Sequence, residues 1–295
     1  MPKKNLEKKE VELLKSGIVT LVGRSNVGKS TLLNSLVGTK LAAVSDKPQT
    51  TRTITHGVIN GPLGQLVLVD TPGIFKEQHS ALSGELIGRV HEALAGIDAI
   101  VYVADPTKNI GSEERYVLSL LRPLTIPKIL IINKSDLPKE EKKYLDEYVA
   151  LSEEFNATFE ISALLNRHVQ PVVEKLFELL PVGEPLYPPG QLTNIDKNFW
   201  AAEIIREKIF LALRKEVPYT THVEIESIEE KPEVIVVKAT IFTSQKQYKK
   251  MIIGLNGRAI KEIGIAARKE LEGALNKKVF LELEVEVDKH WLERA

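Results

Sequence analysis

The stretch Gly23-Arg24-Ser25-Asn26-Val27-Gly28-Lys29-Ser30 decides how the N-terminal part of this chain folds. It matches the pattern Gly-x-x-x-x-Gly-Lys-Ser/Thr, in which backbone amides of a glycine-rich turn surround phosphate groups at the start of a helix. The context fits, because a buried-strand pattern at residues 17–22 precedes the motif and a helical pattern at 31–36 follows it. The motif predicts that Lys29 reaches the β- and γ-phosphates and that the Ser30 hydroxyl binds Mg²⁺. The alternative is that the match to this pattern arose by chance, and the other motifs of the chain decide between the two interpretations.

The rest of residues 17–181 alternates short apolar runs with longer helical patterns. Runs at 17–22, 65–69, 99–103 and 128–132 are typical of strands buried on both faces, as a parallel sheet covered by helices requires. A further strand is predicted at 158–161, and a helix with one apolar stripe at 169–180. The pattern predicts a doubly wound α/β domain of the phosphate-loop type.

Short polar motifs directly follow three of these predicted strands. Asp70-Thr71-Pro72-Gly73 places Asp70 at a carboxyl strand end, where a carboxylate that organises Mg²⁺ belongs. In Asn133-Lys134-Ser135-Asp136, the Asp136 carboxylate can accept hydrogen bonds from both N1–H and the exocyclic amine of guanine. Adenine presents a lone pair at N1, so this carboxylate selects guanine. The backbone amides of Ser162-Ala163 are predicted to meet guanine O6.

Each motif alone is also compatible with an ordinary polar turn, so the argument rests on their coincidence. Strands of an open parallel sheet direct their carboxyl ends into one crevice, and all four motifs are therefore expected to converge on one guanine nucleotide, GTP or GDP. ATP is disfavoured by Asp136. The predicted nucleotide-binding residues are Gly23, Arg24, Ser25, Asn26, Val27, Gly28, Lys29, Ser30, Thr31, Asp70, Thr71, Pro72, Gly73, Asn133, Lys134, Asp136, Ser162 and Ala163.

A proline-rich connector separates this domain from a second one. Residues 181–193 hold four prolines and two glycines in thirteen positions, which is typical of a stiff, extended linker. Beyond it, the patterns predict a helix at 199–214, strands at 222–228 and 234–242, two helices, and a closing strand that alternates cleanly at 279–288. This order, αββααβ, predicts a separate α+β domain. The expected divisions are a tail at 1–16, a first domain at 17–181, a linker at 182–195 and a second domain at 196–295.

Gly254-Leu255-Asn256-Gly257 is a Gly-x-x-Gly turn between two helical segments of the second domain. Residues 246–278 carry nine basic residues against three acidic ones, although the chain has a net charge of zero. Basic residues of the following helix fall on one face and apolar residues on the opposite face. A solvated helix is the alternative, but beside this turn the pattern favours binding of single-stranded RNA. The predicted RNA-binding residues are Lys250, Ile253, Gly254, Leu255, Asn256, Gly257, Arg258, Lys261 and Arg268. The segment Lys250-Met251-Ile252-Ile253 and Ile263 are expected to supply an apolar floor for the bases.

Composition excludes several other classes of protein. The chain has 295 residues, 43% of them hydrophobic and 27% charged, which fits two globular domains and argues against wholesale disorder. The absence of cysteine excludes disulfides, thiolate zinc sites and cysteine nucleophiles, and fits a reducing cytoplasm. No signal peptide and no run of about 20 apolar residues is present, so we expect a soluble protein whose membrane contact, if any, is peripheral. We also expect a monomer.

The motifs at 23–30, 70–73, 133–136 and 162–163 look like those of translation-factor-class GTPases. Together with the linker and the second domain, they resemble the bacterial Era GTPases over nearly the whole chain. The resemblance implies a type II KH domain at 196–295, binding to small-subunit ribosomal RNA near its 3′ end, and a part in assembling the small ribosomal subunit. It also leaves open peripheral contact with the inner membrane. Two departures from the family are Ser25, where a proline is usual, and Leu255, where a lysine is common.

The resemblance also assigns roles in GTP hydrolysis. Gln49-Thr50-Thr51-Arg52 resembles the first switch, which implies that Thr51, with Thr50 as close competitor, closes over Mg²⁺ when GTP is bound. The implied catalytic residues are Lys29, Thr51 and Gly73, and the implied Mg²⁺ ligands are Ser30, Thr51 and Asp70.

Two features bear on the rate of hydrolysis. Ile74 stands where Ras-like enzymes have a water-orienting glutamine, so intrinsic hydrolysis is expected to be slow. Asn26 matches the asparagine that binds K⁺ in related potassium-activated GTPases, and the alternative is a residue that only shapes the loop. Arg24 and Arg52 are candidates for a catalytic role, although surface arginines beside a switch more often have none. The rival function is a membrane-associated or protein-docking regulatory GTPase or scaffold with little catalysis.

Overall fold

The computed structural model of the chain describes residues 14–39, 41, 55–70, 96–213 and 217–290. The tail predicted at 1–16 therefore lies mostly outside the described residues. The same holds for both predicted switch segments, which include Thr50, Thr51, Arg52, Thr71, Pro72, Gly73 and Ile74.

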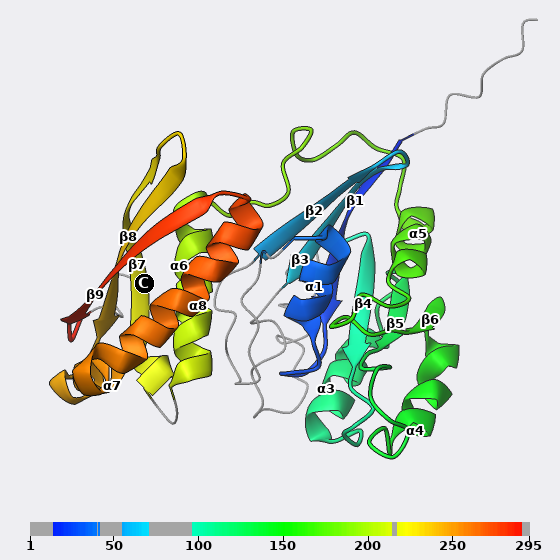
Figure 1. Ribbon diagram of the computed structural model, residues 1–295. Coiled ribbons are helices and arrows are strands. Elements are labelled where there is room, and N and C mark those ends of the chain that lie inside the picture. The colour runs from blue at the N-terminus through cyan, green and yellow to red at the C-terminus, as the bar shows by residue number, and fades with distance from the viewer. Residues whose placement is uncertain (1–13, 40, 42–54, 71–95, 214–216, 291–295) are drawn as a thin grey trace, which may run out of the picture.

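The N-terminal half is a six-stranded sheet with helices on both faces (Figure 1). Its strand order is β2-β3-β1-β4-β5-β6, and all neighbours pair in parallel except β2 and β3. The elements are β1 (Lys15–Val22), α1 (Lys29–Val37), β2 (Thr55–Gly61), β3 (Gly64–Asp70), β4 (Ala99–Ala104), α3 (Ser112–Leu121), β5 (Lys128–Ile132), α4 (Leu145–Val149), the 3-10 helix η1 (Ala150–Glu154), β6 (Ala157–Glu160) and α5 (Gln170–Leu179). The predicted doubly wound α/β fold is confirmed.

The apolar runs of the central strands are continuous because both faces of the sheet are buried. Every residue of β3 and of β4 is buried. Successive side chains of a strand point to opposite faces. Val101 and Val103 of β4 therefore pack into the layer under α1 and α5, whereas Ile100 and Tyr102 pack into the layer under α3 and α4. Two hydrophobic layers thus hold the strand ends rigidly in place.

β2 was not predicted, and it is the antiparallel edge strand of this sheet. Its pattern is broken by Gly57, whose added Cβ would lie 2.7 Å from Val37 of α1, so this strand needs a glycine for close packing. The proline-rich connector lies against this sheet. Its residues pair with β2 and β1, through bridges of Thr193 to Gly57 and of Val182 to Lys15.

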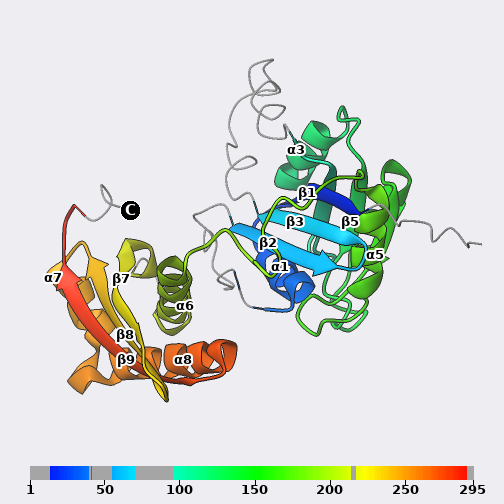
Figure 2. The same ribbon diagram turned by 90° about the horizontal axis from the view of Figure 1, so that it is seen from above.

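The C-terminal half is a three-stranded sheet of order β7-β8-β9, with α6 and α8 on one of its faces (Figure 2). β7 and β8 are antiparallel, and β8 and β9 are parallel. The elements are α6 (Lys197–Ala212), the 3-10 helix η2 (Val217–Thr220), β7 (Thr221–Glu230), β8 (Val234–Thr243), α7 (Lys246–Ile253), the 3-10 helix η3 (Leu255–Gly257), α8 (Arg258–Leu275) and β9 (Lys278–Val287). The predicted αββααβ order and the alternation of the closing strand are confirmed.

Helix ends in both halves carry local signals that the sequence contains. The Asp196 side chain accepts a hydrogen bond from the Phe199 amide at the start of α6, which is an N-cap. Gly38 ends α1 in the left-handed conformation and donates to Asn34. Within the described residues, no helix is long and apolar enough to span a lipid bilayer.

Candidate nucleotide site and candidate RNA-binding turn

The sheet brings the predicted nucleotide motifs to one edge. Residue 23 follows β1, Asp70 ends β3, Asn133 follows β5, and Ser162 lies shortly after β6. In the sheet, β3 lies on one side of β1 and β4 lies on the other side. The direction in which successive strands are added therefore reverses at β1. In open α/β sheets, ligands bind outside the carboxyl ends of strands at this reversal. The described motifs therefore surround one position.

The phosphate-loop backbone has the shape that surrounds an anion. Asn26 and Gly28 adopt left-handed conformations, with φ of 64° and 101°. A Cβ at Gly28 would lie 2.3 Å from the Asn133 side-chain nitrogen, and one at Gly23 would lie 2.4 Å from the Val103 carbonyl oxygen. Only glycine fits these two positions. Gly28 precedes α1 and no side chain caps this helix, so its first amides face the site at the positive end of the helix dipole.

The residues predicted to hold Mg²⁺ lie together where the structure describes them. The Ser30 hydroxyl donates to Asp70 Oδ2 at 3.1 Å, and Asp70 is almost fully buried. A hydroxyl beside a buried carboxylate is an oxygen donor set that suits Mg²⁺. Lys29 lies across the loop and donates from Nζ to the carbonyl oxygens of Gly23 and Arg24, each at 2.7 Å. The residues present thus fit a Mg²⁺-bound phosphate chain.

At the base end, Asn133 ties three motifs together. Its side-chain nitrogen donates to the Val27 carbonyl of the phosphate loop at 2.9 Å, and its oxygen accepts from the Ala163 amide at 3.0 Å. Asn133 is buried, and these bonds occupy its amide with protein partners. The Ser162 amide donates to the Arg167 carbonyl at 3.2 Å. Both amides predicted to meet guanine O6 therefore already have acceptors, and contact with the base there would require a shared hydrogen bond.

Asp136 and Lys134 flank this end of the site. Among the described residues, the half-buried Asp136 carboxylate has no hydrogen-bond or ion-pair partner, as expected of a group that awaits a ligand. Lys134 has a left-handed backbone, with φ of 64°. Its Nζ lies 2.7 Å from Oδ2 of Asp105, a fully buried carboxylate that directly follows β4.

Asp105 is a site residue that the sequence reasoning missed. Its other oxygen accepts from the amide and the hydroxyl of Thr107. Burial alone would raise the pKa of Asp105, but the hydrogen bonds from Lys134 and Thr107 outweigh it and lower the pKa. The available signal was its position, since Asp105 directly follows an apolar run, as Asp70 and Asn133 do.

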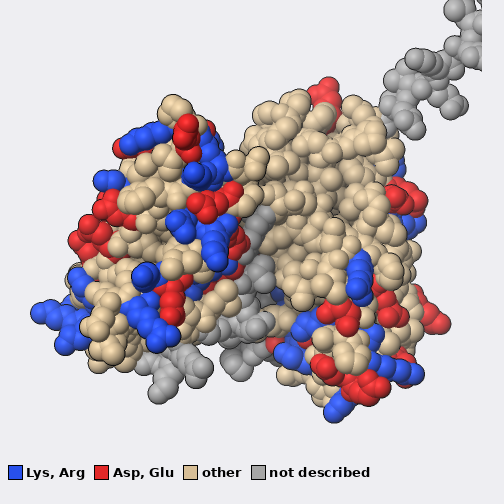
Figure 3. All heavy atoms as spheres, in the orientation of Figure 1, with Lys and Arg blue, Asp and Glu red and all other residues tan. Residues whose placement is uncertain are grey.

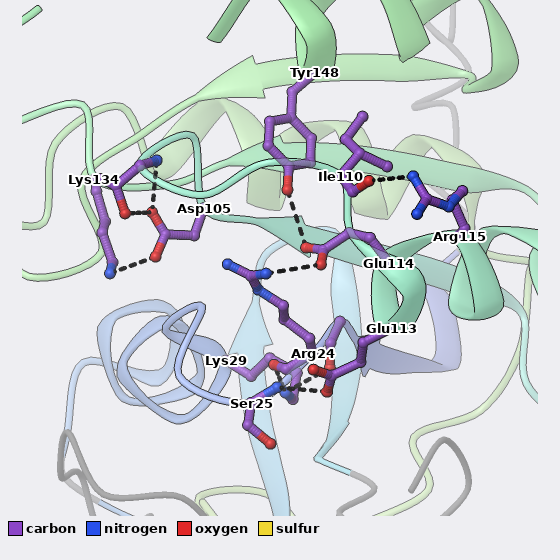
Figure 4. A network of polar contacts seen from close by, with 12 residues as sticks. Arg24, Ser25, Lys29, Asp105, Ile110, Glu113, Glu114, Arg115, Lys134 and Tyr148 are labelled. Carbon is purple, nitrogen blue, oxygen red and sulfur yellow. Dashed lines mark hydrogen bonds and ion pairs between the residues drawn. The ribbon is translucent and has the colours of Figure 1, made fainter. Parts of the chain in front are cut away.

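Arg24 is not a surface arginine, although the sequence pattern suggested one. Its side chain is 12% exposed and turns away from the loop toward α3, where Nη1 lies 3.2 Å from Glu114 Oε2 (Figure 4). A guanidinium engaged in this way does not act on a phosphate. In this structure the Arg24 guanidinium is therefore directed to Glu114, and its backbone lies in the phosphate loop.

The Gly-x-x-Gly turn connects α7 to α8 through unusual backbone conformations. Gly254, Asn256 and Gly257 all have positive φ, at 75°, 51° and 76°. A Cβ at Gly254 would lie 2.7 Å from Ala259, so the turn packs tightly against the start of α8. Leu255 is 86% exposed at its tip. The exposed backbone permits the close approach of a nucleic-acid backbone.

The basic residues predicted around the turn lie on the surface. Lys250, Lys261 and Arg268 are exposed and have no acidic partner among the described residues, whereas Arg258 pairs with Glu262 at 2.9 Å. Figure 3 shows Lys and Arg gathered on this face of the domain. The predicted apolar floor needs correction. Two of its members, Ile252 and Ile263, are buried in the domain core, because they lie on the helix faces that pack on the sheet. Of the other predicted apolar members, Met251 is 53% exposed and Ile253 is half-buried.

Comparison with known proteins matches each half of the chain to a protein family. Residues 18–134 match the family described as 50S ribosome-binding GTPase, and residues 216–292 match the KH domain family. GTPase Era of Carboxydothermus hydrogenoformans is 41% identical over 280 residues, which is 94% of each chain. GTPase Era of Geobacter metallireducens is 40% identical over 283 residues, 95% of this chain and 94% of that one.

Two solved structures are similar over their whole length. Aquifex aeolicus Era bound to GDP and AlF4⁻ is 35% identical, covers 95% of this chain and 96% of its own, and superposes with a TM-score of 0.80. Era in complex with MgGDPNP and nucleotides 1506–1542 of 16S ribosomal RNA is 36% identical, with the same coverage and a TM-score of 0.81.

A phosphate-loop GTPase domain joined to a KH domain defines a class of two-domain GTPases. Identity of about 40% over nearly the full length places the chain within that class. The chain belongs to the Era family of GTPases.

Proposed function

We propose that this GTPase is a switch that binds small-subunit ribosomal RNA near its 3′ end and assists assembly of the small ribosomal subunit. The observation that carries the proposal is the presence, on one chain, of strand-end nucleotide motifs and a basic Gly-x-x-Gly turn. The relative that was crystallised with MgGDPNP and a 16S ribosomal RNA segment supports it, since its likeness extends over both domains. In this proposal, residues 17–181 form the GTPase domain, 182–195 the linker and 196–295 the RNA-binding domain.

The chain's own residues would act as follows. The phosphate-loop amides and Lys29 bind the phosphates, and Asp136 accepts from the guanine edge. Ser30, Asp70 and Thr51 would hold Mg²⁺, which when bound neutralises charge on the phosphates. Gly73 and Thr51 would respond to the γ-phosphate, so that the segments carrying them change with nucleotide state. Ile74 cannot orient water, so intrinsic turnover is slow.

Potassium is proposed as the activator that compensates for Ile74. Asn26 is the residue assigned to it, and its left-handed backbone equally suits a purely loop-shaping role. GTP hydrolysis compared in KCl and in NaCl at equal ionic strength separates the two. Faster turnover in KCl that Asn26→Ala abolishes supports K⁺ binding, whereas equal rates in both salts exclude it.

The proposed function is tested by nucleotide choice and RNA binding in the full chain. The chain should bind GTP at least about 10⁴-fold more tightly than ATP, because ATP leaves Asp136 unpaired. Asp136→Asn should weaken GTP binding and favour xanthosine triphosphate, which presents a carbonyl where guanine has the amine. The same chain should bind a 16S 3′-terminal RNA fragment better than a scrambled fragment. Equal affinity for ATP and GTP, or no preference for that RNA, would refute the proposal.

A further inference from the structure

The buried contact between Arg24 and Glu114 joins the phosphate loop to helix α3. Arg24 is the second residue of the loop, and Glu114 lies in the first turn of α3, with a side chain that is fully buried. Two other guanidinium nitrogens of Arg24, Nε and Nη2, are buried without a hydrogen-bond partner among the described residues. Leaving buried donors unpaired costs stability. Stability alone is therefore a poor explanation for an arginine at this position.

Glu114 is held from the far side as well. Its Oε1 accepts from the Tyr148 hydroxyl of α4 at 3.0 Å, as Figure 4 shows. Burial raises the pKa of the Glu114 carboxyl, and the Arg24 guanidinium opposes this rise. The carboxylate is thus fixed between α4 and the phosphate loop.

The neighbouring glutamate holds the next residue of the same loop. Glu113 Oε1 accepts from the Ser25 amide at 3.3 Å. Two successive side chains at the start of α3 therefore contact two successive residues of the loop, one through a side chain and one through the backbone. This double attachment lies immediately before Asn26 and Gly28, whose left-handed conformations shape the turn.

We propose that Glu114 is a positioning residue for nucleotide binding, which acts through Arg24 to hold the first turn of the phosphate loop in its anion-binding shape. The amides of the loop must be aimed before the phosphates arrive, because a site that is already ordered loses less binding free energy to ordering itself when the ligand binds. The inference rests on the proposed nucleotide site, and it concerns two largely buried side chains that contact each other.

The competing explanation is that the pair only neutralises buried charge. Arg24→Met and Glu114→Gln each remove one partner, and the double variant removes both charges together. Under the competing explanation, the double variant should regain both the thermal stability and the nucleotide affinity that the single variants lose. Under our proposal, it should recover thermal stability but not nucleotide affinity.

The measurements are GDP and GTP dissociation constants and thermal unfolding of the nucleotide-free full chain. We expect the double variant to bind GDP and GTP about 10-fold to 100-fold more weakly, in parallel, because the loop surrounds phosphates that both nucleotides share. Its preference for GTP over ATP should be unchanged, since Asp136 is untouched. Wild-type affinity in a stable double variant would overturn the proposal.

A matched control lies at the other end of the same helix. Arg122 forms an exposed, two-point ion pair with Glu154. Arg122→Met should leave the dissociation constants of GDP and GTP unchanged. Weaker nucleotide binding by this variant would mean that any disturbance of α3 lowers the affinity, and would contradict a specific role for Glu114. Failure of the wild-type chain to bind GTP would instead count against the proposed function, so the two failures are distinguishable.

Discussion

The imidazole Nδ1 of His56 lies 2.6 Å from the Tyr187 hydroxyl, which fastens the proline-rich connector to β2. The two rings meet edge to face, with centroids 6.1 Å apart. The His56 amide also donates to the Asn194 side chain, and Gln65 exchanges two hydrogen bonds with the Tyr187 backbone. The connector is thus anchored to the edge of the GTPase sheet at the strand that directly follows residues 42–54.

Protonation of His56 should weaken folding. Burial lowers the pKa of this imidazole from 6.5, so the folded chain resists a proton that the unfolded chain binds. The contribution of neutral His56 to the free energy of unfolding is therefore fully present above about pH 6.5. This contribution is lost as the pH falls toward the lower pKa of the folded state, by at most about 1.4 kcal/mol per pH unit. Urea unfolding of the wild type and of His56→Gln at about pH 8 and pH 5.5 measures it. A difference that does not change with pH would contradict the prediction.

Removal of the Asp105 charge should weaken guanine-nucleotide binding. Asp105→Asn weakens the ion pair that holds Lys134, so we expect a loss of about tenfold in GDP affinity. The measurement is titration with GDP of the full chain, with folding checked by thermal unfolding. Glu147→Gln is the control, because Glu147 is an exposed carboxylate on neighbouring α4. Equal losses in both variants would contradict a specific role for Asp105.

A lysine at the tip of the Gly-x-x-Gly turn should strengthen RNA binding. Leu255 is 86% exposed, so Leu255→Lys fits without repacking and adds one phosphate contact. The affinity should rise, and the slope of log K against log salt should steepen by about 0.7. Phe280→Lys adds the same charge on the outer face of the sheet and should leave that slope unchanged. Equal effects of both variants would mean that the turn is not the contact point.

Glu262 should act as a competitor for RNA phosphate at Arg258. The pair is exposed, at 83% and 60%, so its net strength is small. Glu262→Gln should free the guanidinium and raise RNA affinity about twofold to fivefold at low salt, as filter binding would show. The control is Glu282→Gln, which disrupts the exposed ion pair between Lys238 of β8 and Glu282 of β9. Unchanged or weaker binding by Glu262→Gln would exclude Arg258 as a phosphate contact that this pair limits.

Much of the fold could be predicted because its signals are local. Strands β3 and β4 are buried on both faces, so their apolar runs are continuous in the sequence. β9 alternates because only one of its faces is buried. β2 was missed because Gly57 interrupts its apolar pattern and because the connector that pairs with its outer edge lies far away in the chain.

The candidate site was predictable to the extent that it depends on strand ends. Residues 23–30, Asp70, Asn133 and Asp136 were found because each follows an apolar run, and a parallel sheet places such ends together. Asp105 also follows an apolar run, but its role depends on the contact with Lys134, which is 29 residues away and is not encoded in any local pattern.

By itself, the sequence determined the class of fold and predicted the phosphate loop and a carboxylate that selects guanine, because periodicity and short-range motifs depend on residues that are near one another in the chain. Only the tertiary structure decided that Arg24 turns inward to Glu114, that Asn133 joins three motifs, and that the connector is fastened by His56 and Tyr187. These contacts join residues that are distant in sequence, and the direction of a buried polar side chain depends on which partner packing brings within hydrogen-bond reach.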